Sequence, residues 1–125
     1  MTAIEIWNEK IGTQVVKALK SNFFEAYYCS TKKEAKEKIL SLIPENDIVS
    51  WGGCRTMEEI GVIEEMKSGK YNVIDRDTAK TPDEKFAMMH QALLCGTYLS
   101  GTNAVTQDGK LFNIDNVGNR AAAIT

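Results

Sequence analysis

The chain has few of the residues that build metal centres and disulfide frameworks. Its 125 residues include three cysteines, one histidine and two prolines. Cys29, Cys54 and Cys95 lie far apart and form no C-x-x-C pair, which excludes a zinc ribbon or an iron–sulfur cluster held by this chain alone. An odd number of cysteines without a secretory signal is typical of the reducing cytosol, so we expect a cytoplasmic protein.

The chain also lacks a long apolar run and an excess of basic charge. No apolar segment approaches the roughly 18 residues of a membrane span, and the N-terminus is predicted to form an amphipathic helix rather than a signal peptide. The formal net charge is −2, which leaves no basic face for nucleic acid. We therefore expect no membrane and no nucleic acid among the partners. A length of 125 residues predicts a single domain spanning residues 1–125.

What the chain does contain is a regular alternation of predicted helices and strands. Apolar residues at helical spacing and helix-capping signals predict four helices, near residues 4–18, 31–42, 56–68 and 82–93. The capping signals pair Thr31 with Glu34, Thr56 with Glu59 and Thr81 with Glu84. Strands are predicted in FFEAYYC, DIVSW, YNVID and TYLSG, which begin at residues 23, 47, 71 and 97. This order predicts an α/β fold with a largely parallel sheet flanked by helices.

A β-hairpin insertion is predicted near residues 102–115, around the turn signal Asp108-Gly109. If these two residues form the turn, the cross-strand pairs are Gln107–Lys110, Val105–Phe112, Asn103–Ile114 and Thr102–Asp115. This register predicts that Asp115, Asn119 and Arg120 cluster with Thr102 and Asn103. A slip of one residue would undo the cluster.

The chain has only three arginines, and each of them follows a predicted strand or hairpin. They are Arg55, Arg76 and Arg120, whereas the twelve lysines spread over predicted helices and turns. In open α/β sheets the carboxyl ends of the strands form the ligand crevice, and guanidinium can bind carboxylate or phosphate through two hydrogen bonds. We therefore expect a small anionic ligand at this edge. The alternative is that the arginines pair with structural carboxylates such as Asp75 and Asp115.

The stretch WGGCRT, residues 51–56, strengthens this expectation. Gly52 and Gly53 are predicted to leave backbone N–H groups unobstructed in front of a helix beginning at Thr56, whose dipole favours anions. A tight turn alone would give the same pattern. Cys54 has no histidine at a suggestive spacing, so we interpret it as a packed or ligand-facing thiol rather than a Cys–His nucleophile.

Three longer segments resemble the lactate-utilisation (LUD) domain family in their order and spacing. They are SWGGCRTMEEIGV, YNVIDRDTAKTPDE and SGTNAVTQDGKLFNIDNVGNRAAA, and the resemblance extends from about Asp47 to the end. It implies an α/β domain related to the ribose-5-phosphate isomerase and coenzyme A transferase superfamily. It also implies a role in the oxidation of L-lactate to pyruvate, in which a partner protein carries iron–sulfur clusters. The family's motif residues fall on Gly52, Gly53, Thr56, Glu59, Asp75, Arg76, Thr102, Asn103, Asp115, Gly118, Asn119 and Arg120.

The chain departs from the family pattern at three places. Cys54 stands where the family usually has serine, and Asn116 stands where glycine is usual. Family members usually continue beyond the position of Thr125, so we expect a domain that is truncated at its C-terminal end or completed by a partner. The last residues, AAAIT, are predicted to begin a buried strand. Its unpaired edge would pair with another chain, which predicts a homo-oligomer.

The leading hypothesis is a LUD-like domain that binds a small anionic metabolite in lactate or other organic-acid utilisation. Arg55, Arg76 and Arg120 would hold the anion, and Asp115 is the candidate base or nucleophile. We expect no cofactor in this chain, and any iron–sulfur cluster on an oxidoreductase partner. The alternatives are a sugar-phosphate isomerase, an enzyme of acyl or coenzyme A transfer, and a metabolite-binding module without catalysis.

Overall fold

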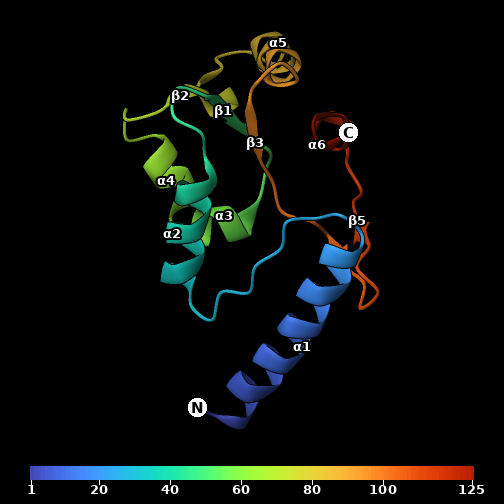
Figure 1. The fold of residues 1–125 in the computed structure, drawn as a ribbon. Coiled ribbons are helices and arrows are strands. Elements are labelled where there is room, and N and C mark those ends of the chain that lie inside the picture. Colours follow the sequence, from blue (N-terminus) through green and yellow to red (C-terminus); the bar gives the residue numbers. More distant parts are fainter. The chain divides into compact units, whose positions relative to one another are not determined.

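The computed structural model describes all residues from Met1 to Thr125 (Figure 1). They form two compact units, and each is described by itself. Unit 1 comprises Met1–Ala35 and Thr102–Asn113, and unit 2 comprises Lys36–Gly101 and Ile114–Thr125. None of the helices combines the length and the apolar character needed to cross a bilayer.

Unit 2 contains the parallel sheet that the alternating pattern predicts. Strands β1 (Ile48–Trp51), β2 (Asn72–Ile74) and β3 (Thr97–Leu99) pair in the order β2-β1-β3. In this register Ser50 of β1 lies opposite Ile74 on one side and Tyr98 on the other. The α/β class and a small parallel sheet flanked by helices are therefore confirmed.

The two faces of this sheet differ because successive side chains of a strand point in opposite directions. Val49, Trp51 and Leu99 belong to the apolar core, together with residues of α4 (Val62–Met66). Ser50 and Tyr98 occupy the alternate positions of the same strands. They line a hollow with Ala92 of α5 (Pro82–Ala92), which contacts β1 and β2. Figure 1 shows α5 and the pair α2 (Lys32–Leu42) and α4 on different sides of β1.

The helix predicted from Thr56 onward is divided in two. Arg55–Glu59 forms α3, and Gly61 then adopts a left-handed conformation, φ 84°, before α4 begins. Glycine tolerates this conformation because it has no Cβ, so the chain turns at this position. The predicted capping box of Thr56 and Glu59 is wrong. The N-cap of α3 is Cys54, without a side-chain hydrogen bond, and Glu59 binds Arg55 one turn away instead.

The other two capping signals mark true helix starts. Thr31 Oγ1 accepts a hydrogen bond from the Glu34 N–H at the start of α2, 3.1 Å long. Thr81 does the same for the Glu84 N–H at the start of α5, with Pro82 at the first helical position. In both cases the glutamate carboxylate bonds the residue before the threonine. A short 3₁₀ turn, η1 (Arg76–Thr78), lies between β2 and α5.

Unit 1 consists of one long helix and a hairpin. Helix α1 (Ala3–Ser21) begins with a capping box of Thr2 and Glu5. The predicted strand FFEAYYC is wrong, because residues 23–29 contain no strand. An extended segment becomes a strand only where a neighbouring strand pairs with its backbone groups, and aromatic content does not supply that neighbour.

The hairpin forms, but in a different register from the predicted one. Strands β4 (Ala104–Val105) and β5 (Leu111–Phe112) pair Val105 with Leu111 rather than with Phe112. The loop contains three residues instead of two. The Gly109 N–H donates to the Thr106 carbonyl, and Gly109 has a φ of 83°. A tight turn followed by a left-handed glycine is the usual three-residue hairpin loop, and it shifts the pairing by one residue. The predicted pairing of Thr102 with Asp115 is therefore wrong.

The C-terminal residues form a helix, α6 (Asn119–Ile124), and not the predicted strand. Alanine has the highest helix propensity, and the Asp115 carboxylate accepts the N–H of Ala121 in the first turn. The exposed strand edge that we expected to drive association is consequently absent from residues 121–125. A homo-oligomer stays a prediction without that support.

Candidate functional site

The carboxyl ends of the parallel strands bring some of the predicted site residues, Gly52, Gly53, Arg76 and Arg120, to one edge of the sheet. The surroundings of the two glycines after β1 show how closely side chains from the other elements approach this strand end. A Cβ added to Gly53 would lie 2.9 Å from Arg76 Nη2. A Cβ on Gly52 would lie 2.9 Å from the Tyr98 hydroxyl and 3.4 Å from Arg120 Cδ. The two glycines therefore make room for side chains that arrive from the other strands and from α6.

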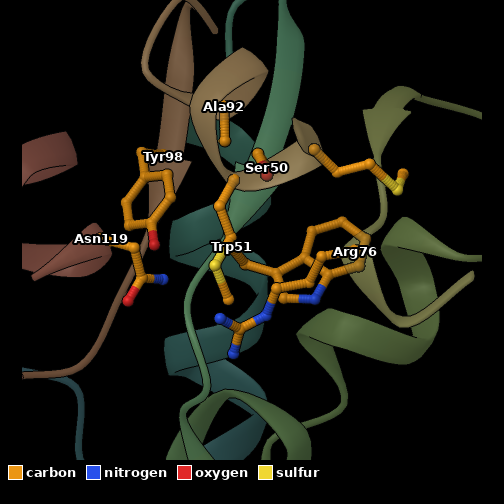
Figure 2. Close-up of a pocket in the computed structure, with 8 residues that line it drawn as sticks. Ser50, Trp51, Arg76, Ala92, Tyr98 and Asn119 are labelled. Atoms are coloured by element: carbon orange, nitrogen blue, oxygen red, sulfur yellow. The ribbon is translucent and has the colours of Figure 1, made fainter. Parts of the chain in front are cut away.

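A small hollow lies on the Ser50 face of the sheet, next to this edge. Figure 2 shows Arg76, Tyr98, Asn119 and Trp51 around it. Its other lining residues are Ser50, Met88, Met89 and Ala92. The hollow has a volume of about 10 Å³, which is the room needed for about one water molecule. A whole metabolite does not fit inside it, so any ligand must lie at its mouth and insert at most a single atom.

The three arginines have three different environments. The Arg55 side chain is 89% exposed, and its Nε bonds Glu59 of the same helix at 3.0 Å. Arg120 is largely buried and lies beside Asp115. Arg76 is half-buried, and its guanidinium makes neither an ion pair nor a hydrogen bond within the chain. The expectation of structural pairing thus holds for Arg55 and Arg120, whereas Arg76 has no such carboxylate.

Asp115 and Arg120 form the most buried ion pair of the site. Their side chains are 9% and 12% exposed, and Arg120 Nε lies 2.9 Å from one Asp115 oxygen, with the geometry of an ion pair rather than a hydrogen bond. The other Asp115 oxygen accepts the Ala121 N–H, and Arg120 Nη2 donates to the Ile114 carbonyl at 3.1 Å. Both carboxylate oxygens are therefore engaged in holding the segment that leads into α6.

The backbone of the glycine stretch differs from its predicted role as an anion cradle. Gly52 is buried, and its N–H donates to the Leu99 carbonyl at 3.1 Å, so this group does not face a ligand. Gly53 is exposed. Helix α3, which follows, has only five residues, and we therefore attach no anion site to its N-terminus. The side chain of Arg76, rather than the backbone, is the cationic group at this position.

The remaining predicted site residues lie in different places. Asp75 accepts the Asp77 N–H and lies 3.8 Å from Lys67 Nζ. Cys54 approaches Gly101, whose added Cβ would lie 2.6 Å from its Sγ. Thr56 and Glu59 are exposed on α3. No group of three or more histidine, cysteine, aspartate or glutamate side chains is placed to hold a metal ion.

Thr102 and Asn103 belong to unit 1. Their predicted clustering with Asp115 stays a prediction, but the hairpin register on which it depended is wrong. Within that unit both residues donate to the Phe112 carbonyl at 3.1 Å, Thr102 through its hydroxyl and Asn103 through its backbone N–H. They thereby close the open end of the hairpin.

Tyr98, whose hydroxyl reaches the same edge as Arg76, was not among the predicted site residues. Burial raises the pKa of this phenol above its ordinary value, and the charge of Asp115 acts in the same direction, while Arg76 and Arg120 oppose it. The hydroxyl is therefore neutral near pH 7 and able to donate a hydrogen bond. The available signal was its position, since Tyr98 is the second residue of the predicted strand TYLSG and alternates with the apolar Leu99.

The fold and this edge define an α/β protein with a candidate ligand site at the carboxyl ends of its strands. The family model of the LUD domain matches residues 12–125, so the chain belongs to the LUD domain family. No similar protein was found among the curated proteins or among the solved structures.

Proposed function

We propose that this LUD-domain protein binds a small anionic metabolite at the carboxyl ends of β1, β2 and β3 and acts in lactate or other organic-acid utilisation. Membership of the LUD domain family supports the metabolic role. The observation that carries the binding site is the half-buried Arg76 guanidinium without a carboxylate partner.

A guanidinium in this situation indicates an external anion. Partial burial removes water from a charge, which costs free energy unless an opposite charge or hydrogen bonds compensate it. The nearest candidate in sequence, Asp75, already bonds the Asp77 N–H and lies beside Lys67. A bound carboxylate or phosphate would supply the missing acceptors through two parallel hydrogen bonds.

The environment of Asp115 argues against a catalytic role for this residue and so favours a protein that binds a metabolite without transforming it. Acyl transfer through a carboxylate needs an oxygen that can attack the substrate. Both Asp115 oxygens are occupied, one by Arg120 and the other by the Ala121 N–H. We therefore rank a metabolite-binding module above a sugar-phosphate isomerase or a coenzyme A transfer enzyme. The relationship to the coenzyme A transferase superfamily is part of the proposal.

The resemblance to the LUD family also supports a proposal about the cellular compartment and the partner protein. We propose that the chain works in the cytoplasm and that any redox step belongs to an iron–sulfur oxidoreductase partner. Its three cysteines are distributed over both units and are all free thiols. A pull-down from cells grown on lactate, with detection of iron in the captured complex, tests this part of the proposal.

Arg76→Gln is expected to weaken anion binding at least tenfold while the stability of the free protein stays nearly unchanged. A hydrogen bond to a charged group contributes about 1.5–3 kcal/mol, and each 1.4 kcal/mol is a factor of ten in affinity. A ligand is first identified by thermal shift with lactate, pyruvate, sugar phosphates and acyl-coenzyme A compounds. At 100 times its Kd a ligand adds about 2.7 kcal/mol of stability. Calorimetry then gives the affinity of the wild type and of the variant.

The matched control is Arg55→Gln, which removes an equal charge from an exposed arginine that bonds Glu59. We expect its affinity to stay within about twofold of the wild type, because an exposed ion pair contributes little. Equal losses in the two variants would indicate a general effect of charge and would refute the assignment of Arg76. Unchanged affinity in Arg76→Gln would refute it as well.

Gly53→Ala tests the same site without changing any charge. The new Cβ would lie 2.9 Å from Arg76 Nη2, and the flexible guanidinium must move away from it. We expect weaker anion binding with little loss of stability, because the displaced atom is the far end of a side chain. Full affinity in this variant would show that the position of the guanidinium next to Gly53 is not the one used for binding.

A further inference from the structure

The hollow beside Arg76 is too small for a whole anionic group. Its volume of about 10 Å³ corresponds to about one water molecule. Arg76, Tyr98 and Asn119 provide polar groups around it, and Trp51 and the Met88–Met89 pair provide apolar walls. A single ligand oxygen fits in this volume. The volume thus limits the ligand to one inserted oxygen, and the charge around the hollow decides between a carboxylate and a phosphate.

The charge around the hollow favours a carboxylate over a phosphate. Arg120 is compensated by Asp115, and Lys67 lies near both Asp75 and Asp77. Arg76 is therefore the one guanidinium of this edge whose charge has no counterpart in unit 2. One positive charge matches a carboxylate, whereas a phosphate monoester carries a charge of roughly −1.5 to −2 at pH 7.

Tyr98 is placed to bind the oxygen that enters the hollow. Its ring stands on the Ser50 face of β3 (Figure 2). Its hydroxyl lies 2.9 Å from the position of a Cβ added to Gly52. The hydroxyl makes no hydrogen bond within the chain. Since burial raises the pKa of Tyr98, the hydroxyl keeps its proton at neutral and mildly alkaline pH and acts as a donor.

We propose that Tyr98 is a ligand-binding residue, whose hydroxyl donates to one oxygen of a singly charged carboxylate held by Arg76, and that the site rejects phosphates. The inference depends on the proposed anion site and narrows its ligands to monocarboxylates. Asn119, at the start of α6, provides a second neutral polar group for the same oxygen or its neighbour.

The test is calorimetric titration of the wild type, Tyr98→Phe and Tyr71→Phe with acetate, L-lactate, pyruvate, inorganic phosphate and ribose 5-phosphate. Tyr71 is the matched control, because it is a half-buried tyrosine of unit 2 that packs against the core and does not line the hollow. We expect at least one monocarboxylate to bind the wild type at least tenfold more tightly than either phosphate compound. Tyr98→Phe should lose about tenfold in that affinity, and Tyr71→Phe less than twofold.

The outcomes separate this inference from the proposed function. If Arg76→Gln abolishes binding and Tyr98→Phe does not, the anion site stands and the role of Tyr98 is refuted. Phosphate affinity equal to that of the carboxylates refutes the selectivity, and this measurement needs only the wild type. If no anion binds, both proposals fall. Wild-type carboxylate affinity should also stay constant between about pH 7 and pH 9, because Tyr98 remains protonated there.

Discussion

Asp115→Ala is expected to lower the free energy of unfolding by about 3 kcal/mol. The substitution removes one partner of an ion pair whose side chains are 9% and 12% exposed. It leaves the Arg120 guanidinium in a desolvated position and takes the acceptor from the Ala121 N–H in the first turn of α6. Urea denaturation followed by circular dichroism measures the loss. Amide hydrogen exchange should show it first in residues 114–125.

Asp77→Ala is the control for this prediction. Asp77 is also paired with a cation, Lys67 at 3.4 Å, but its side chain is 51% exposed. Water screens such a pair, so we expect a loss of less than about 1 kcal/mol. Losses of the same size in the two variants would show that Asp115 does not hold α6 in place. The carboxylate would then be available for chemistry, and the acyl-transfer alternative would gain support.

The edge that carries the candidate site could be predicted from the sequence, but the partner of each side chain could not. Parallel strands end at the same edge of their sheet, so residues just after β1 and β2 had to meet there. Arg76 does lie beside Gly53, as this rule requires. Arg55 follows a strand too, yet it lies one helical turn before Glu59 and binds it. A local partner at this spacing competes with any distant ligand, and sequence position alone does not decide the competition.

Helices that carry their own signals were predictable, whereas elements that depend on a neighbour were not. Thr81 and Pro82 determine where α5 begins, because a cap acts within one turn. Residues 23–29 have the composition of a strand but pair with no other strand. The segment 121–125 has the small apolar residues of a buried strand, but its alanines continue a helix that Asp115 caps. The absence of a partner strand decided the first case, and helix propensity with a local carboxylate decided the second.

The hairpin shows how one backbone conformation changes a register. The Asp-Gly signal predicts a two-residue turn, in which both residues are left-handed. Only Gly109 of this pair has a positive φ, so Asp108 belongs to the preceding turn and the loop gains a residue. Both turn types use glycine at this position. The Asp-Gly signal therefore predicts a hairpin but leaves two registers possible. In the register that is observed, the loop packs against α1.

That packing leads to the second large prediction, in which Gly109→Ala destabilises unit 1 by about 3 kcal/mol. Gly109 is buried with φ 83°, which an alanine adopts only with strain. Its added Cβ would also lie 2.6 Å from the carbonyl carbon of Ala18 and 2.8 Å from the Leu19 nitrogen, both in the backbone of α1. Helix backbone does not yield as a side chain does, so the loop must move away and lose the hydrogen bonds that Asn22 donates to Asp108 and Gly109. Thermal unfolding measures the total loss, and amide exchange of the hairpin locates it.

Gly69→Ala separates the two causes of this loss. Gly69 also has a positive φ, 91°, but no atom lies within 4 Å of its added Cβ. The variant therefore carries the backbone strain without the collision and should lose only about 1 kcal/mol. The excess loss in Gly109→Ala then measures how firmly the hairpin loop is held against α1. Equal losses in the two variants would mean that the loop leaves α1 at little cost, and the close approach of Gly109 to Ala18 would not stabilise the unit.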